Sequence, residues 1–168
     1  MPPEEMKNKV CIITGGGGSI GLASARRMYD AGARIMLVDL NEDNLAIAKA
    51  SFDDKNRVSV CTADVSVSAE TKHYIAKTEN NWGKIDVLFA NAGFSGTSAP
   101  TTDYPEDLFD KVMAVNVRGS FLACKYALPK MNDGGSIIIT SSIMGVTARP
   151  GSIAYITSKH AVIGLMRG

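Results

Sequence analysis

The sequence predicts one α/β domain, in which a doubly wound parallel sheet carries helices on both faces. Three observations lead to this fold class. Short apolar, β-branched runs alternate with longer helical patterns, a glycine-rich turn joins the first run to the first helix, and no repeat or linker divides the 168 residues. Strands that alternate with helices require right-handed crossovers, which cover both faces of a parallel sheet.

Each expected strand is a short apolar run bounded by turn residues. In chain order the strands are KVCIIT (9–14), ARIMLVD (33–39), RVSVCTAD (57–64), KIDVLFANAG (84–93) and GSIIITSS (135–142). The helices are expected over 19–32, about 42–50, 68–82 and about 105–130, with a last one beginning near Ala154. The loop-rich segment 93–105 follows the fourth strand, on the side where open α/β sheets bind ligands.

The composition is that of an ordinary globular chain, with 45% hydrophobic residues, 21% charged residues and a net charge of +1. No segment clusters Lys and Arg, which argues against a nucleic-acid partner, and no apolar run is long enough to cross a membrane. The opening MPPEEMKNK lacks the apolar core of a secretory signal. Three widely separated cysteines predict reduced packing residues in a cytoplasmic protein, and no Cys/His spacing predicts a metal site.

The glycine-rich turn reads TGGGGSIG over residues 14–21 and can be aligned in more than one register. G-x-G-x-x-G fits through Gly16, Gly18 and Gly21, whereas T-G-x-x-x-G-x-G fits through Gly15 and Gly21 with Ser19 in the place of a glycine. A glycine turn between a strand and a helix can hold a phosphate, because the helix N-terminus offers free N–H groups and a partial positive charge. The Gly-Lys-Ser/Thr ending of a P-loop is missing.

Asp39 lies eighteen residues after Gly21 and ends the second expected strand. A carboxylate at this place can accept hydrogen bonds from both hydroxyls of an adenosine ribose, and it repels a 2′-phosphate. Leu40 follows it instead of an arginine that would neutralise such a phosphate, so the sequence favours NAD over NADP. The alternative is that Asp39 caps a helix, a role for which Asn41 is better placed.

The segment YITSK places Tyr155 and Lys159 four residues apart, on one face of a helix. A phenol holds its proton well above neutral pH, and a nearby ammonium group makes the phenolate easier to form. Ser142 precedes Tyr155 by 13 residues and ends the fifth expected strand on the ligand side, with Ser141 as the alternative. The three side chains therefore predict acid–base chemistry at the same edge as the glycine turn.

Four motifs together resemble the classical short-chain dehydrogenase/reductase family: TGGGGSIG, NAG at 91–93, VNV at 115–117, and Ser142 with YITSK. The resemblance implies a Rossmann-like fold in which Ser142 holds the substrate oxygen and Tyr155 transfers the proton. It implies that Lys159 also holds the nicotinamide ribose and that Asn116 extends a water-linked proton relay to Lys159. For Asn116 the alternative is a local helix kink satisfied by water.

The resemblance also implies that Asp64 and Val65 contact the adenine and that the NAG residues line the cofactor. It favours the T-G-x-x-x-G-x-G register, in which Gly15 makes the turn and Gly21 lets helix and sheet pack closely, so that the fit through Gly16 is a coincidence. Ser19 then caps the helix, donates to a phosphate or crowds the cofactor. The expected cofactor-binding residues are Gly15, Gly18, Ser19, Ile20, Gly21, Asp39, Leu40, Asp64, Val65, Asn91, Ala92, Gly93, Tyr155 and Lys159, and the expected catalytic residues are Asn116, Ser142, Tyr155 and Lys159.

The function expected from this resemblance is NAD-dependent hydride transfer between a secondary alcohol and a ketone, in a homotetramer or homodimer. The alternatives are an NAD-binding scaffold or regulator without turnover and an epimerase of the related extended type, whose G-x-x-G-x-x-G spacing also fits the turn. The family continues past the catalytic helix with two more strands and a substrate-covering segment. We therefore expect residues 1–168 to be the N-terminal part of a longer one-domain protein.

Overall fold

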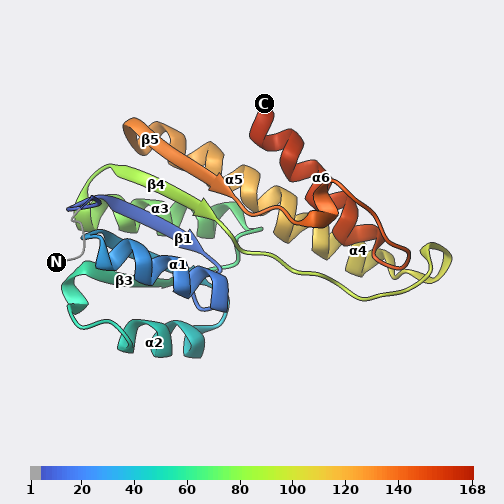
Figure 1. The fold of residues 1–168 in the computed structure, drawn as a ribbon, viewed down its shortest axis with the longest axis horizontal. Coiled ribbons are helices and arrows are strands. Elements are labelled where there is room, and N and C mark those ends of the chain that lie inside the picture. Colours follow the sequence, from blue (N-terminus) through green and yellow to red (C-terminus); the bar gives the residue numbers. More distant parts are fainter. Residues whose placement is uncertain (1–4) are drawn as a thin grey trace.

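The computed structural model describes residues 5–168, so the first four residues of the opening segment that was excluded as a secretory signal lie outside the described part (Figure 1). The strands are β1 (Val10–Thr14), β2 (Arg34–Asp39), β3 (Val58–Thr62), β4 (Ile85–Ala90) and β5 (Met131–Ile139). The helices are α1 (Ser19–Asp30), α2 (Glu42–Ala50), α3 (Ser68–Trp82), α4 (Glu106–Met113), α5 (Gly119–Ala127) and α6 (Ile153–Arg167).

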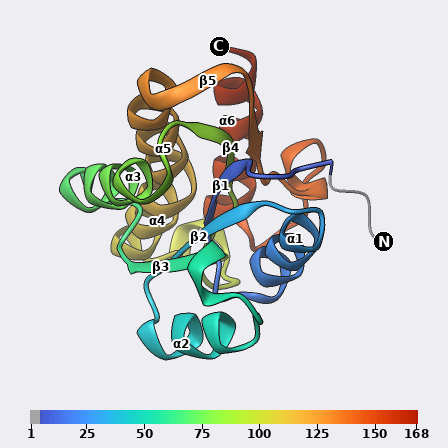
Figure 2. The same ribbon diagram turned by 90° about the vertical axis from the view of Figure 1, so that its left-hand side faces the viewer.

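All five strands are parallel and lie in the order β3-β2-β1-β4-β5. The order reverses between β1 and β4, and this is the point at which doubly wound sheets open a crevice for ligands. The end-on view shows α1 and α2 on one side of the sheet and α3 with α5 on the other (Figure 2). The predicted doubly wound parallel sheet with helices on both faces is thus confirmed.

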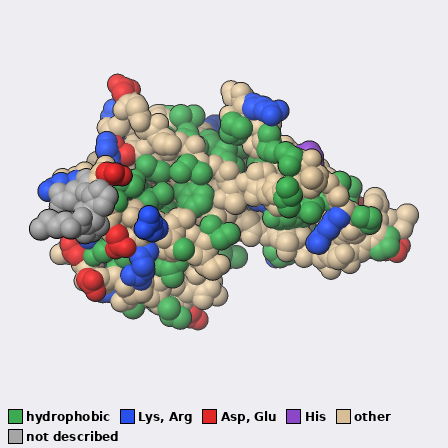
Figure 3. Space-filling view, in the orientation of Figure 1, with side chains coloured by type: hydrophobic (Ala, Val, Ile, Leu, Met, Phe, Trp, Pro, Cys, Tyr) green, Lys and Arg blue, Asp and Glu red, His purple; other side chains and the backbone are tan. Residues whose placement is uncertain are grey.

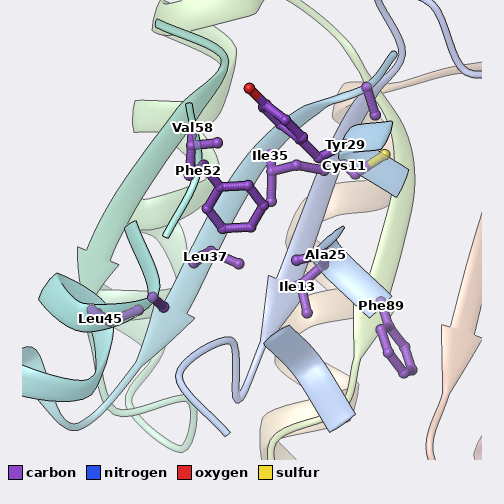
Figure 4. Packing of buried hydrophobic residues seen from close by; sticks show 12 residues of the cluster. Cys11, Ile13, Ala25, Tyr29, Ile35, Leu37, Leu45, Phe52, Val58 and Phe89 are labelled. Carbon is purple, nitrogen blue, oxygen red and sulfur yellow. The ribbon is translucent and has the colours of Figure 1, made fainter. Parts of the chain in front are cut away.

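Two apolar layers hold the helices on the sheet. Between the sheet and α1 and α2, side chains such as Ile35 and Leu37 pack against Tyr29 and Phe52 (Figure 4). On the other face, Tyr74 of α3 and Ala123 of α5 pack against the strands. β1 and the interior of β2 send buried apolar side chains into both layers, as expected for parallel strands buried on both faces.

The fifth strand begins earlier than the sequence predicts and ends earlier as well. β5 spans Met131–Ile139, whereas 135–142 was expected. Its ladder with β4 starts at Ile85 with Met131 and resumes only at Val87 with Ser136, so the Asn-Asp-Gly-Gly segment bulges out of the ladder between these pairs. The turn residues therefore interrupt the pairing without delimiting the strand. Ser142 consequently lies beyond the strand and not at its end.

The helix expected over 105–130 is not one regular helix. α4 is followed by a π-helical turn over Ala114–Arg118, then by α5 and a short 3₁₀ turn. A π turn widens the helix by one residue and commonly marks a functional position. Asn116 lies in the middle of this turn and is buried.

Two lobes are visible in the molecule. The sheet and its helices form the larger lobe, while α4, α6 and the loop after β4 extend away from it (Figure 1). The space-filling view shows hydrophobic side chains gathered on the front of the sheet lobe (Figure 3). β5 lies at the edge of the sheet and is largely exposed, with Ile138 43% exposed.

Candidate active site

A cleft of about 560 Å³ opens at the carboxyl ends of the strands, where the two lobes meet. It is lined by the glycine turn, by the ends of β2, β3 and β4, and by α4 and α6. All the residues predicted to bind a cofactor line this cleft, as do the predicted catalytic residues Tyr155 and Lys159. Asn116 and Ser142 are not among the lining residues. Segments far apart in the sequence thus converge on one site.

Gly15 makes the turn out of β1, as predicted. Its φ of +66° lies in the left-handed region, which glycine adopts without steric cost. A side chain here would also approach Ala92 and Asn91 of the neighbouring loop within 3.0 Å. The first glycine of the run is therefore required both by its backbone angle and by its neighbours.

The close contact of Gly21 is different from the one predicted. A Cβ at Gly21 would overlap the carbonyl oxygen of Gly15, so this glycine lets the helix approach the turn and not the sheet. Instead, Gly16 lies against the sheet, where an added Cβ would come within 2.9 Å of Leu37 Cβ. The prediction that Gly16 matches a motif only by coincidence overlooked this packing against β2.

Ser19 does not cap the helix. The N-cap of α1 is Gly18, and Ser19 is the first helical residue, so its side chain is not placed to accept from the N–H groups of the following turn. The first helical hydrogen bond joins Leu22 N to Gly18 O at 2.8 Å. The N–H groups of Ser19, Ile20 and Gly21 therefore precede the helical ladder and are available at the mouth of the cleft.

Two backbone N–H groups hold the carboxylate of Asp39. Its Oδ2 accepts a hydrogen bond from Gly17 N at 3.0 Å, and its Oδ1 accepts one from Asn41 N at 3.1 Å. The helix cap belongs to Asn41, whose Oδ1 accepts from Asn44 N at 2.8 Å, as the sequence favoured. The carboxylate of Asp39 is thus oriented before any ligand binds, and it lines the cleft.

Asp64 and Val65 lie at the same end of the cleft as Asp39 and Leu40. The carboxylate of Asp64 accepts hydrogen bonds from the backbone N–H and the hydroxyl of Ser66, at 2.8 and 2.7 Å. Its backbone N–H donates to Glu70 at 2.6 Å. These contacts hold the loop after β3 in place at this wall of the cleft.

Asn91 joins the ends of three strands. Its side-chain Nδ2 donates to Thr14 O at 3.1 Å and to Gly15 O at 3.5 Å, and its Oδ1 accepts from Thr140 Oγ1 at 3.1 Å. The backbone N–H groups of Asn91 and Ala92 both donate to Thr14 Oγ1 at 3.0 Å. The first two residues of the NAG motif therefore bind the glycine turn of the protein itself as well as lining the cleft.

Lys159 is only 4% exposed, and its ammonium donates to Thr140 O at 2.8 Å. Its Nζ lies 5.5 Å from the centre of the Tyr155 ring, so the pair meets on one helix face as predicted. Burial lowers the pKa of Lys159 from its ordinary value. The cation is therefore close to the phenol in a largely desolvated position, where its charge acts most strongly.

The side-chain amide of Asn116, in the π turn, forms hydrogen bonds with protein groups. Its Oδ1 accepts from Phe94 N at 2.7 Å, and its Nδ2 donates to Phe94 O at 3.0 Å and to Ser158 Oγ at 2.9 Å. Gly93 passes between Asn116 and the ammonium of Lys159, since a Cβ built there would lie 3.5 Å from Asn116 Oδ1 and 3.6 Å from Lys159 Nζ. Asn116 thus holds Ser158, which precedes Lys159 in α6, and Phe94 in the loop after β4.

Ser142 stands at the start of a 3₁₀ turn over Ile143–Gly145, and its Oγ accepts a hydrogen bond from Met144 N at 3.2 Å. Because its hydroxyl accepts this bond, its own proton remains available to another acceptor. Ser141, the alternative, donates to Lys159 O at 3.0 Å and is thus engaged with the helix backbone. The geometry favours Ser142 over Ser141 for a contact with a ligand.

The sequence did not predict seven of the lining residues: Ala63, Ser66, Phe94, Lys111, Ala114, Val115 and Thr140. Lys111 lies one helical turn before Val115, so the i, i+4 spacing could have identified it. Its Nζ lies 5.2 Å from the centre of the Phe94 ring. Thr140 lies at the carboxyl end of β5, the position from which strands of such a sheet contribute to ligand sites.

A model of the short chain dehydrogenase family matches residues 9–168. The chain belongs to the short-chain dehydrogenase family. The resemblance inferred from the four motifs is thereby confirmed.

Individual family members resemble the chain over nearly its whole length. Levodione reductase of Leifsonia aquatica is 35% identical over 99% of this chain and 64% of its own length. 2-(R)-hydroxypropyl-CoM dehydrogenase of Xanthobacter autotrophicus is 39% identical over 95% of this chain and 66% of its own. A crystal structure of NAD⁺-bound xylitol dehydrogenase superimposes with a TM-score of 0.92, at 39% identity, covering 96% of this chain and 63% of that one. The chain thus spans less than two thirds of these relatives.

The cleft suits the dinucleotide that this family implies. Its volume lies in the range of about 300–1,000 Å³ typical of ligand sites. The helix mouth at Ser19 offers free N–H donors for a pyrophosphate, and Asp39 offers an oriented acceptor for ribose hydroxyls. Within residues 5–168 no cluster of His, Cys, Asp and Glu forms a metal site, and no helix there could span a membrane.

Proposed function

We propose that the protein is an NAD-dependent oxidoreductase that interconverts a secondary alcohol and a ketone. The observation that carries this proposal is a single cleft with the glycine turn and Asp39 at one end and Tyr155 with Lys159 at the other. The glycine turn and Asp39 would hold the dinucleotide, and Tyr155 and Lys159 would act beside its nicotinamide. Related proteins that are named as a reductase and a dehydrogenase support the reaction class.

NAD is proposed over NADP because of the carboxylate of Asp39. It accepts from Gly17 N and Asn41 N and lines the cleft, and a carboxylate at this place suits ribose hydroxyls and repels a phosphate. Leu40 adds no compensating cation. The NAD⁺-bound relative supports the same choice.

Bound NAD supplies the acceptor for a hydride from the alcohol carbon. The chain's own residues handle the proton: Tyr155 takes it from the alcohol hydroxyl, and the charge of Lys159 stabilises the phenolate that does so. Ser142 holds the substrate oxygen with the hydroxyl proton that its bond from Met144 leaves free. In the reduction direction the same groups act in reverse.

The substrate itself is proposed only as a small alcohol or ketone, drawn against residues 95–101 and 143–151. Ile143 and Val146 in the second segment are 66% and 69% exposed, so apolar side chains are available to meet it. The homotetramer or homodimer and the cytoplasmic location remain predictions.

The experiment is NADH formation by the protein over a panel of secondary alcohols and diols, with NADP⁺ as the competing cofactor. Tyr155→Phe is the matched control, because it removes one hydroxyl and keeps the ring. We expect turnover with NAD⁺, and a fall of about 10²–10⁴-fold in kcat/KM for Tyr155→Phe with NADH binding retained. Equal turnover by the variant would refute the role of Tyr155.

NADH binding without turnover on any substrate would favour the second candidate, an NAD-binding regulator. The observation in its favour is that Ser142 is not among the residues that line the cleft. A preference for NADP⁺ would instead contradict the role given to Asp39.

A further inference from the structure

We propose that Thr140 is a positioning residue that couples the glycine turn to Lys159, an inference that rests on the proposed function. Thr140 follows β5 and lines the cleft between Asn91 and Lys159. It uses its two ends differently: its hydroxyl contacts Asn91, and its carbonyl contacts Lys159.

The hydroxyl end fixes the orientation of the Asn91 amide. Nδ2 of Asn91 faces two carbonyl oxygens, those of Thr14 and Gly15, so its Oδ1 must point away from them toward Thr140. Thr140 Oγ1 donates to this Oδ1 at 3.1 Å. Without the hydroxyl, the Asn91 Oδ1 loses its only side-chain donor among the residues that the structure describes, and the amide loses the bond that holds its orientation.

The carbonyl end holds the ammonium. Thr140 O accepts from Lys159 Nζ at 2.8 Å, and Thr140 N donates to Ala90 O at 3.1 Å, which continues the β4–β5 ladder past its last strand pair. The residue is thus fixed to β4 by its backbone while it contacts α6 through the carbonyl. A shift of Thr140 moves both contacts together.

These bonds form one chain from the cofactor turn to the acid–base pair: Gly15 O to Asn91, Asn91 to Thr140, and Thr140 to Lys159. Gly15 and Lys159 both line the cleft. Thr140 therefore connects the residue that binds the glycine turn with the ammonium of Lys159. Its hydroxyl acts on NAD binding through Asn91 and does not itself react.

The test compares Thr140→Val with Thr140→Ser by titrating each purified protein with NADH in the absence of any substrate. Valine keeps the shape, the β-branched backbone preference and the carbonyl that holds Lys159, but it removes the hydroxyl. Serine keeps the hydroxyl. We expect Thr140→Val to weaken NADH binding about tenfold and Thr140→Ser to stay within about twofold of the unchanged protein.

Two controls separate positioning from a general loss of stability. Thr62→Val makes the same change at the exposed carboxyl end of β3, outside the cleft lining, and should leave NADH binding unaltered. In an Asn91→Ala background, Thr140→Val should have no further effect, because its partner is already gone. If Thr140→Val fails to fold, Thr140→Ala against Thr140→Ser replaces it in the same comparison.

Equal NADH binding by Thr140→Val and the unchanged protein would overturn the coupling, as would an undiminished effect of Thr140→Val in the Asn91→Ala background. If Thr140→Ser weakened NADH binding as much as Thr140→Val does, the coupling would be overturned too. If the unchanged protein does not bind NADH at all, the proposed function falls and this inference falls with it. The two failures are thus distinguishable from one titration series.

Discussion

The cofactor end and the catalytic end of the cleft are built in different ways. At the cofactor end, backbone N–H groups hold the side chains: Gly17 N and Asn41 N bind Asp39, and Ser66 N binds Asp64. At the catalytic end, side chains bind one another or distant carbonyls, as Asn116 binds Ser158 and Lys159 binds Thr140. The cofactor end therefore depends on the path of the backbone, whereas the catalytic end depends on how α6 packs against the π turn and the end of β5.

The two ends should therefore be sensitive to different kinds of substitution. A change that forces the backbone to move should damage the cofactor end most, even when it removes no polar group. A change in charge or hydrogen bonding should act chiefly at the catalytic end. The three predictions below test this contrast, beginning with the largest expected effect.

Gly21→Ala should abolish most cofactor binding. The added Cβ would overlap the Gly15 carbonyl oxygen, and the three nearest atoms all belong to the backbone of Gly15 and Gly16, so no flexible side chain can yield. We expect NADH binding to weaken by more than about 30-fold and the free energy of unfolding to fall by about 1–3 kcal/mol. NADH titration and urea denaturation measure the two quantities.

The matched control is Gly164→Ala within α6, where a Cβ would meet no atom within 4 Å. In a helix interior this change should stabilise the protein by about 0.5–1 kcal/mol and leave NADH binding unaltered. If Gly21→Ala bound NADH as well as Gly164→Ala does, the cofactor end would not be limited by its backbone path.

Lys159 should make stability rise with pH in the alkaline range. Burial lowers its pKa in the folded protein, so between that value and the ordinary lysine pKa of about 10.4 the unfolded chain binds more protons. The free energy of unfolding therefore increases with pH in this window, by at most about 1.4 kcal/mol per pH unit, and is unaffected below it. Urea denaturation at a series of pH values measures the slope.

Lys159→Met supplies the reference, because it keeps an unbranched apolar chain and removes the titrating group. Any excess in the free energy of unfolding of Lys159→Met over the unchanged protein should shrink or reverse as pH rises. Parallel stability curves would contradict the burial of a charged Lys159 at the catalytic end.

Ser19→Gly should have the smallest effect of the three. Since Gly18 is the N-cap, Ser19 contributes no cap bond to lose, and its exposed hydroxyl is free to donate to a phosphate at the helix mouth. We expect NADH binding to weaken about two- to fivefold, with Ser19→Ala giving the same result. Tighter binding by Ser19→Gly alone would show that the side chain crowds the cofactor instead.

Much of the cofactor end could be predicted because its signals are local. A strand, a glycine turn and a helix follow one another directly, and Gly15 has the positive φ that this turn demands. Asn41 caps α2, and Asp39 lines the cleft, as the side-chain preferences of helix caps indicated. The places of Tyr155 and Lys159 on one helix face likewise follow from the i, i+4 rule.

The predictions are wrong where a contact between residues far apart in the sequence determines the local structure. The partners of Gly16 and Gly21 could not be told apart, because the contact with Leu37 depends on how β2 lies beside β1. The limits of β5 depend on its ladder with β4, and the π turn at Asn116 depends on bonds to Phe94 and Ser158, 22 and 42 residues away. A local sequence pattern gives no information about contacts between residues so far apart in the chain.

The sequence by itself determined the fold class, the family and the residue types that meet at the ligand edge, because hydrophobic period, glycine placement and helix spacing are local properties of the chain. Only the tertiary structure decided which glycine meets the sheet, where Ser142 stands and how Asn91, Thr140 and Lys159 connect. Those facts depend on side chains from separate strands and helices meeting in space. Their hydrogen bonds form only once the sheet order and the helix packing are in place.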